Sequence, residues 1–131
     1  MDRQDVSLRK QVQQKDYIVI VETDDLIREL LERWLGEAGY AVLTATPDAP
    51  ALEQPPRLVI VNVSKPRHPG ALIRSLQATY AAPILVVSAR FRRGLEGSAN
   101  AARQLGARKV LPKPFTRAEL LAAVRESIEG P

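Results

Sequence analysis

The chain has 131 residues and a mass of 14.5 kDa, which fits one domain of a common size. It contains no cysteine and one histidine, His68, which excludes a disulfide scaffold, a thiol nucleophile and a His-rich metal centre. No apolar run approaches the ~20 residues of a membrane span, and residues 1–16 lack the apolar core of a signal peptide. We therefore expect a cytoplasmic domain over residues 17–129, preceded by a polar tail.

The net charge of +4 conceals a segregation of charge along the chain. Residues 54–118 hold twelve Lys and Arg residues against one acid, Glu96, so this segment carries +11 and the remainder carries −7. The pattern predicts either a solvated arginine-rich surface or a binding surface for an acidic partner. The candidate partner-binding residues are Arg90, Arg92, Arg93, Arg108 and Lys109.

Hydrophobic patterning predicts a strand, a helix and a second strand at the start of the domain. Tyr17–Val21 is a continuous apolar and mostly β-branched run, which is typical of a strand buried on both faces. Apolar residues recur at helical spacing over residues 27–35, and the preceding Asp24 suits the positive end of that helix. Residues 40–45 predict a strand, and the prolines of residues 46–56 leave room for one or two helical turns at most.

The same alternation continues to the end of the chain. We expect strands over residues 58–63, 84–88 and 109–111, and helices over residues 70–80 and 98–105. Thr116 and Glu119 form a capping box that opens a last helix. Five β-α units with short connections predict an α/β fold: a five-stranded parallel sheet with helices on both faces.

In a parallel sheet of this kind, functional residues gather beyond the carboxyl ends of the strands. The polar residues expected there are Glu22, Thr23, Asp24, Asn62, Ser88 and Lys113. The glycines form no phosphate-cradling motif, so a nucleotide site is not favoured.

Four segments that carry these residues resemble the response-regulator receiver domains of two-component signalling. They are Val21–Leu30, Leu58–Gly70, Pro83–Ala89, and Gly106-Ala107 followed by Leu111–Phe115. The resemblance extends from Tyr17 to about Ile128 and implies the flavodoxin-like (βα)5 receiver fold. It also implies a cis peptide bond between Lys113 and Pro114.

The resemblance assigns a role to each polar position. Receiver domains hold Mg²⁺ with three carboxylates, one of which is phosphorylated; a hydroxyl and a lysine bind the phosphoryl group, and an aromatic residue switches inward. By position, the acidic pair falls on Glu22 and Thr23, the phosphoacceptor on Asn62, the hydroxyl on Ser88, the lysine on Lys113 and the switch residue on Val110.

These substitutions predict a degenerate pocket. A neutral amide at Asn62 is a poor nucleophile for phosphoryl transfer. Glu22 is the one family carboxylate retained, so we expect no cofactor, or at best weak Mg²⁺ binding if Asp24 bends back toward it. We expect a salt bridge between Glu22 and Lys113, and an Asn62 amide bonded to Lys113 or to the backbone.

The resulting hypothesis is a non-enzymatic interaction module that works without phosphorylation. It would bind a histidine kinase, an output protein or a second copy of itself through the last two helices and the fifth strand, the face that the family commonly uses. Two alternatives are a working phosphorelay receiver with unusual acceptor chemistry and a basic surface that binds a ligand or nucleic acid. Nucleic acid is disfavoured because only 5% of the residues are aromatic, too few for base stacking.

Overall fold

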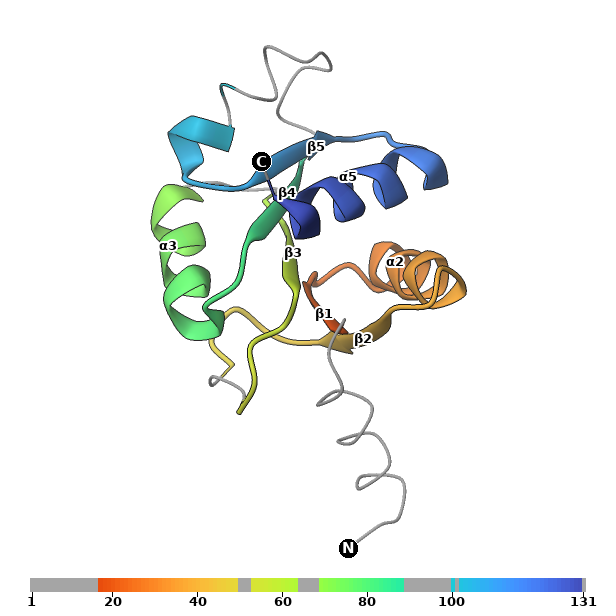
Figure 1. The fold of residues 1–131 in the computed structure, drawn as a ribbon, viewed down its shortest axis with the longest axis horizontal. Coiled ribbons are helices and arrows are strands. Elements are labelled where there is room, and N and C mark those ends of the chain that lie inside the picture. The colour runs from red at the N-terminus through yellow and green to blue at the C-terminus, as the bar shows by residue number, and fades with distance from the viewer. Residues whose placement is uncertain (1–16, 50–52, 64–68, 89–99, 101, 131) are drawn as a thin grey trace, which may run out of the picture.

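The structure, a computed structural model, describes residues 17–49, 53–63, 69–88, 100 and 102–130. The tail of residues 1–16, the loop of residues 89–97 with Arg90, Arg92 and Arg93, and His68 lie outside the described residues. Figure 1 shows the arrangement of the described elements in chain order.

The sheet contains five parallel strands in the order β2-β1-β3-β4-β5. They are β1 (Tyr17–Val21), β2 (Ala41–Thr44), β3 (Leu58–Asn62), β4 (Ile84–Ser88) and β5 (Lys109–Pro112). Every residue of β1 and β4 is buried, as expected for apolar strands covered on both faces. The predicted α/β class with a five-stranded parallel sheet is confirmed.

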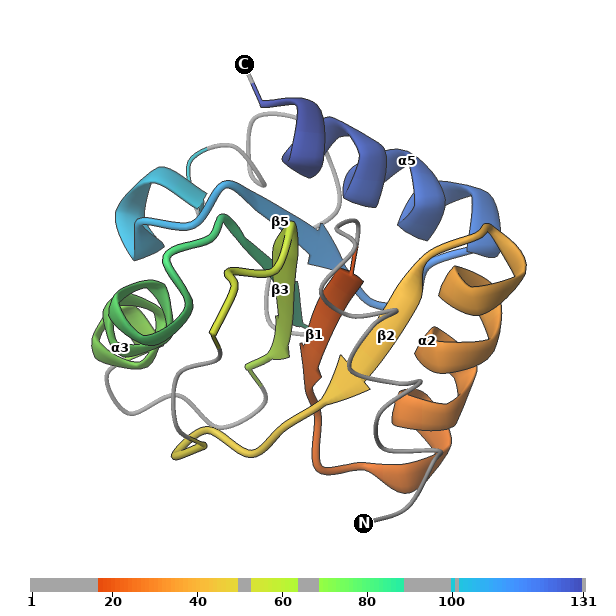
Figure 2. The same cartoon turned by 60° about the horizontal axis from the view of Figure 1, so that its bottom comes forward.

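Helices flank the sheet on both sides, as Figure 2 shows. The helices are α2 (Asp25–Glu37), α3 (Pro69–Tyr80) and α5 (Arg117–Glu129), and residues 102–105 are also helical. The predicted capping box is present, because the Thr116 hydroxyl accepts from the Glu119 N–H and the Glu119 carboxylate accepts from the Thr116 N–H. These caps satisfy N–H groups that the first turn of α5 would otherwise leave without partners.

The strand alternation divides the core into two clusters. Val19 and Val21 face the side of α3, whereas Ile18 and Ile20 face the side of α2 and α5. The largest fully buried side chains come from both clusters, so the sheet is packed on each face. This packing fixes the carboxyl ends of the strands, where the polar residues lie.

The connection from β2 to β3 differs from a regular β-α-β unit. Residues 45–49 and 53–57 contain no helix, in agreement with the proline-rich sequence. A cleft of about 690 Å³ lies beside this connection. Its described lining consists of Glu22, Thr23, Arg28, Leu43, Thr44, Ala45, Thr46, Ala49 and Tyr80.

Candidate functional site

Three polar side chains meet at the carboxyl edge of the sheet. Glu22 follows β1, Asn62 ends β3 and Lys113 follows β5. We call these three residues the pocket cluster. Parallel strands place their carboxyl ends on one edge, so residues 40 to 91 positions apart in the chain become neighbours.

Glu22 is the centre of the pocket cluster. Its side chain is only 2% exposed. Oε2 accepts two hydrogen bonds, from the Asn62 Nδ2 amide and from the Asp24 backbone N–H, each at 3.1 Å. A buried carboxylate needs such partners, because its desolvation in the absence of donors is costly.

The expected ion pair between Glu22 and Lys113 is present. Lys113 Nζ lies 4.0 Å from Glu22 Oε1, and the Lys113 side chain is 22% exposed. The Lys113–Pro114 peptide bond is cis, as the resemblance implied. In the sheet, β3 and β4 lie between β1 and β5, so this ion pair links residues that follow two strands that are not neighbours.

The prediction for the hydrogen-bond partner of Asn62 was wrong. The amide donates to Glu22 rather than to Lys113 or the backbone, because the carboxylate is the strongest acceptor within reach of β3. Within the described residues, two buried oxygens of the cluster have no hydrogen-bond partner: Glu22 Oε1 and Asn62 Oδ1. The cluster is therefore bonded on one side of the carboxylate and open on the other.

Asp24 does not join its carboxylate to that of Glu22. Its Oδ1 accepts from the Ile27 N–H at 3.0 Å and thereby caps α2, so the expected bend toward Glu22 is not seen. Only the backbone N–H of Asp24 reaches the Glu22 carboxylate. Thr23 is exposed at the edge of the cleft and contributes no charge.

Ser88 and Val110 are both held within the fold. Ser88 is fully buried, and its hydroxyl donates to the Val63 carbonyl at 2.7 Å. Val110 is 1% exposed and packs in the core cluster on the side of α3. Neither side chain is presented to solvent at the pocket cluster.

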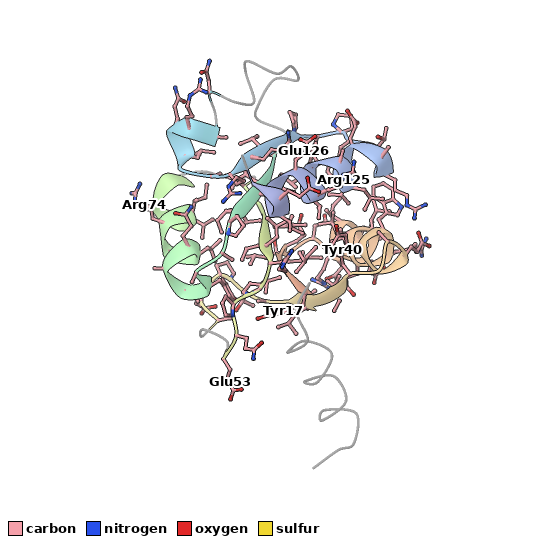
Figure 3. The ribbon with its side chains drawn as sticks, viewed as in Figure 1. Tyr17, Tyr40, Glu53, Arg74, Arg125 and Glu126 are labelled. Atoms are coloured by element: carbon pink, nitrogen blue, oxygen red, sulfur yellow. The ribbon has the colours of Figure 1, made fainter. Side chains whose placement is uncertain are left out.

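Two cations that sequence patterning assigned to a partner surface bind within the protein. Arg108 Nη1 donates to the Ser127 carbonyl at 3.0 Å, and Lys109 Nζ pairs with Glu126 Oε1 at 2.5 Å. Figure 3 labels Glu126 on α5. Sequence patterning also missed Arg28, which donates to the Glu22 carbonyl at 3.4 Å from one turn along α2. The spacing of apolar residues in α2 indicated only the buried face of that helix, so it gave no signal for Arg28.

Comparison with known proteins shows the family. The family model for the response regulator receiver domain matches residues 18–125. Protein PilG of Pseudomonas aeruginosa is 31% identical over 126 residues, which cover 88% of this chain and 91% of that protein. The chain belongs to the response regulator receiver domain family and is thus a receiver domain of two-component signalling.

Other relatives are longer. Response regulator MprA of Mycobacterium sp. (strain KMS) is 37% identical over 114 residues, which cover 82% of this chain and 48% of that protein. Transcriptional regulatory protein CpxR of Klebsiella pneumoniae is 31% identical over 112 residues, or 47% of its length. The chain spans about half the length of these curated relatives.

Solved structures share the fold. The chemotaxis protein CheY4 of Vibrio cholerae superposes with a TM-score of 0.62 at 23% identity, covering 86% of this chain and 98% of CheY4. The receiver domain of the sensor histidine kinase PA1611 of Pseudomonas aeruginosa gives a TM-score of 0.65 at 23% identity, covering 88% of this chain and 99% of that domain. The PA1611 structure has a magnesium ion coordinated in its active-site cleft.

The residues at the corresponding edge of this sheet do not fit a Mg²⁺ site. Magnesium requires near-octahedral oxygen coordination and usually one or two carboxylates. Among the residues that the structure describes, Glu22 is the one buried carboxylate, and it faces the Lys113 ammonium while Asp24 caps a helix. Among the described residues there is no group of three or more His, Cys, Asp or Glu able to hold a metal, and no helix could cross a membrane.

Proposed function

We propose that this receiver domain, residues 17–129, acts without phosphorylation as a protein–protein interaction module. One observation carries the proposal: the residue at the family's phosphoacceptor position, Asn62, is an amide bonded to Glu22. Phosphoryl transfer needs an anionic oxygen nucleophile and a cation that neutralises the developing charge. The pocket cluster offers an amide nitrogen and an ammonium already paired with its carboxylate.

The hydrogen bond of Ser88 and the burial of Val110 support a receiver that is held in one conformation. Ser88, at the position of the family's phosphoryl-binding hydroxyl, donates to Val63, and Val110, at the switch position, is buried. A switch requires two arrangements that a signal can bias. These side chains are already satisfied in one arrangement, so we propose that the domain presents one binding surface constantly.

The partner we propose is a histidine kinase or an output protein in the cytoplasm, or a second copy of the chain. The surface would include β5 and α5, and the basic residues of segment 54–118 favour an acidic partner. The domain would have no enzymatic activity of its own. It would hold its partner through surface complementarity alone.

Incubation with acetyl phosphate and Mg²⁺ tests the proposal. Intact-mass spectrometry should show no phosphorylated fraction in the wild-type chain, because Asn62 lacks a nucleophilic carboxylate. The double variant Thr23→Asp/Asn62→Asp restores the family's acidic residues and is the positive control. A hydroxylamine-sensitive phosphate on the wild-type chain would overturn the proposal and favour the phosphorelay alternative.

A further inference from the structure

The connection from β2 to β3 leaves a cleft beside the edge of the sheet. Leu43 in β2 and Ala45 just after it pack against the core cluster on the side of α3, yet both remain partly exposed. Residues 45–49 and 53–57 contain no helix that would cover them, and Figure 2 shows the described parts of this connection without helical turns. The cleft measures about 690 Å³, within the range of about 300–1,000 Å³ that small-molecule sites occupy. It is far larger than the water-sized voids of a packed core.

One wall of the cleft is apolar. It is formed by Leu43, Ala45, Ala49 and the ring of Tyr80. Tyr80 is only 3% exposed, and within the described residues its hydroxyl has no hydrogen-bond partner. Burial raises the pKa of this phenol, so the hydroxyl stays protonated at neutral pH. The wall therefore offers apolar surface together with a donor that a bound molecule can use.

Arg28 supplies positive charge to the same cleft. Its Nη1 donates to the Glu22 carbonyl at 3.4 Å, its Nη2 pairs with Asp25 at 2.5 Å, and its Nε lies 3.7 Å from Glu32 Oε1. A guanidinium carries five N–H donors, so these three contacts leave two of them for a ligand. The Asp25 and Glu32 side chains are 78% and 44% exposed, so their ion pairs with Arg28 are weak. A carboxylate or sulfonate on a bound molecule can therefore reach Arg28 in competition with them.

Glu22 also lines the cleft, but its negative charge is offset within the pocket cluster. Oε2 accepts from the Asn62 amide and the Asp24 N–H, and Oε1 is buried 4.0 Å from Lys113 Nζ. This charge therefore does little to repel an anion in the cleft. The exposed Thr23 and Thr44 add hydroxyl donors to the described lining.

We propose that this cleft binds a small organic anion, a carboxylate or sulfonate carried on an apolar aromatic or alkyl body. Arg28 binds the anionic group, and the wall that contains Leu43 and Tyr80 covers the apolar body. The inference goes beyond the proposed function and does not rest on it, because the cleft can take a ligand whatever the chemistry at Asn62. The cleft lies beside β2, whereas β5 forms the opposite edge of the sheet, so a ligand here leaves β5 and α5 open to a partner.

Two fluorescent probes that differ in one group test the inference on the full wild-type chain. The anionic probe is 8-anilinonaphthalene-1-sulfonate, and the neutral probe is N-phenyl-1-naphthylamine, which has the same rings without the sulfonate. We expect the anionic probe to bind saturably, with one molecule per chain, and to shift the NMR signals of the amides of Leu43, Ala45 and Tyr80. It should also raise the melting temperature, as a ligand of the native state does.

Variants in matched pairs assign the site. Arg28→Gln should weaken binding of the anionic probe by about tenfold and leave the neutral probe unaffected, because it removes a charge-assisted hydrogen bond. Arg33→Gln, at an exposed position of the same helix, should have little effect on either probe. Ala45→Leu fills the cleft and should weaken both probes, whereas Ala78→Leu adds the same atoms on the exposed face of α3 and should not. Far-UV circular dichroism shows whether each variant is folded, and Ala49→Leu replaces Ala45→Leu if the latter does not fold.

Three results would overturn the inference. The first is no saturable binding of the anionic probe up to about 1 mM, and the second is binding that the cleft-filling variant leaves unchanged. The third is an equal effect of Arg28→Gln and Arg33→Gln, which would reduce the attraction to the general charge of the surface. Phosphate uptake is measured separately from probe binding, so failure of this inference leaves the proposed function standing, and the reverse also holds.

Discussion

At the scale of single residues, Glu22 determines what the pocket cluster can do. Burial makes its charge costly, and the structure offsets this cost with the Asn62 amide, the Asp24 N–H and the Lys113 ammonium. In a receiver with an aspartate at position 62, two carboxylates would face each other and require a cation between them. The amide replaces one of these two charges and donates a hydrogen bond to the carboxylate that remains.

Asn62→Asp should therefore destabilise the protein in the absence of Mg²⁺. The change removes a donor and places two carboxylates within hydrogen-bond distance, at a cost of about 1–3 kcal/mol at pH 7. Mutual repulsion raises the pKa of one carboxyl in the folded state, so the deficit should shrink as the pH falls through that raised pKa. Urea unfolding at pH 7 and pH 5 measures both effects, with Asn62→Ala as the uncharged control. Equal stability of Asn62→Asp and wild type at pH 7 would contradict the assigned contact.

At the scale of elements, α5 is fixed at both ends. The capping box holds its first turn, and at its last turn Arg108, the residue before β5, donates to the Ser127 carbonyl. Gly130 ends the helix at a φ of 79°, and an added Cβ there would lie 2.8 Å from Arg108 Nη1. Glycine therefore serves both the backbone angle and the close approach of the arginine.

Thr116→Ala should weaken the start of α5. Loss of the hydroxyl leaves the Glu119 N–H without its acceptor, which costs about 1 kcal/mol in the free energy of unfolding. Thr116→Ser keeps the acceptor and should remain near wild type. Chemical denaturation followed by circular dichroism distinguishes the two, and equal loss in both variants would contradict a capping role.

Tyr17 of β1 and Tyr80 of α3 should make the contact between these elements sensitive to alkali. Burial raises the pKa of both phenols above 10.0, and for Tyr17 the nearby Tyr80 adds to the rise. Because the folded pKa is raised, the stability that each neutral phenol provides is complete below pH 10 and is lost as the pH rises through the folded value. Figure 3 labels Tyr17 at the amino end of β1, where its hydroxyl donates to the Gln54 carbonyl.

Thermal unfolding from pH 8 to pH 11 tests this sensitivity. The melting temperature of the wild type should fall above pH 10, and Tyr80→Phe should show a smaller fall because it cannot ionise. Tyr40, for which burial is only partial, provides the matched Tyr40→Phe control. An identical fall in Tyr80→Phe and wild type would show that the buried phenol does not contribute.

At the scale of the whole molecule, folding mixes the two charge classes that the sequence separates. Cations of the basic segment pair with acids that lie outside it: Lys113 with Glu22, Lys109 with Glu126, and Arg117 with Glu37. The pairs with Glu126 and Glu37 are substantially exposed, so each contributes little to stability. These ion pairs still reduce the positive field around β5 and α5. Because Lys109 pairs with Glu126 and Arg108 donates to the Ser127 carbonyl, both cations are less available to a partner than the sequence indicated.

The sequence predicts the architecture well because strands such as β1 and β4 are uniformly apolar and sit between clear turn signals. Local chemistry also predicted the capping box, and the family resemblance supplied the cis bond at Lys113–Pro114. The bond from Asn62 to Glu22 could not be predicted, since it depends on side-chain positions 40 residues apart. The cleft beside residues 45–49 could not be predicted either, because the sequence pattern shows where a helix is missing but not the volume that its absence leaves.

The basic segment, residues 54–118, should steer an acidic partner toward the domain by electrostatic attraction. Attraction between a basic surface and an acidic partner mainly raises the association rate, and salt weakens it. With labelled poly-glutamate as the acidic probe, Arg92→Glu/Arg93→Glu should bind more weakly than wild type at low salt, and the difference should narrow as salt rises. Arg33→Glu on the exposed face of α2, in the acidic part of the chain, is the control and should have less effect. Fluorescence anisotropy in a salt series measures these affinities. If the Arg92/Arg93 double variant matches wild type at every salt concentration, these arginines serve solubility alone and the partner is held by other surfaces.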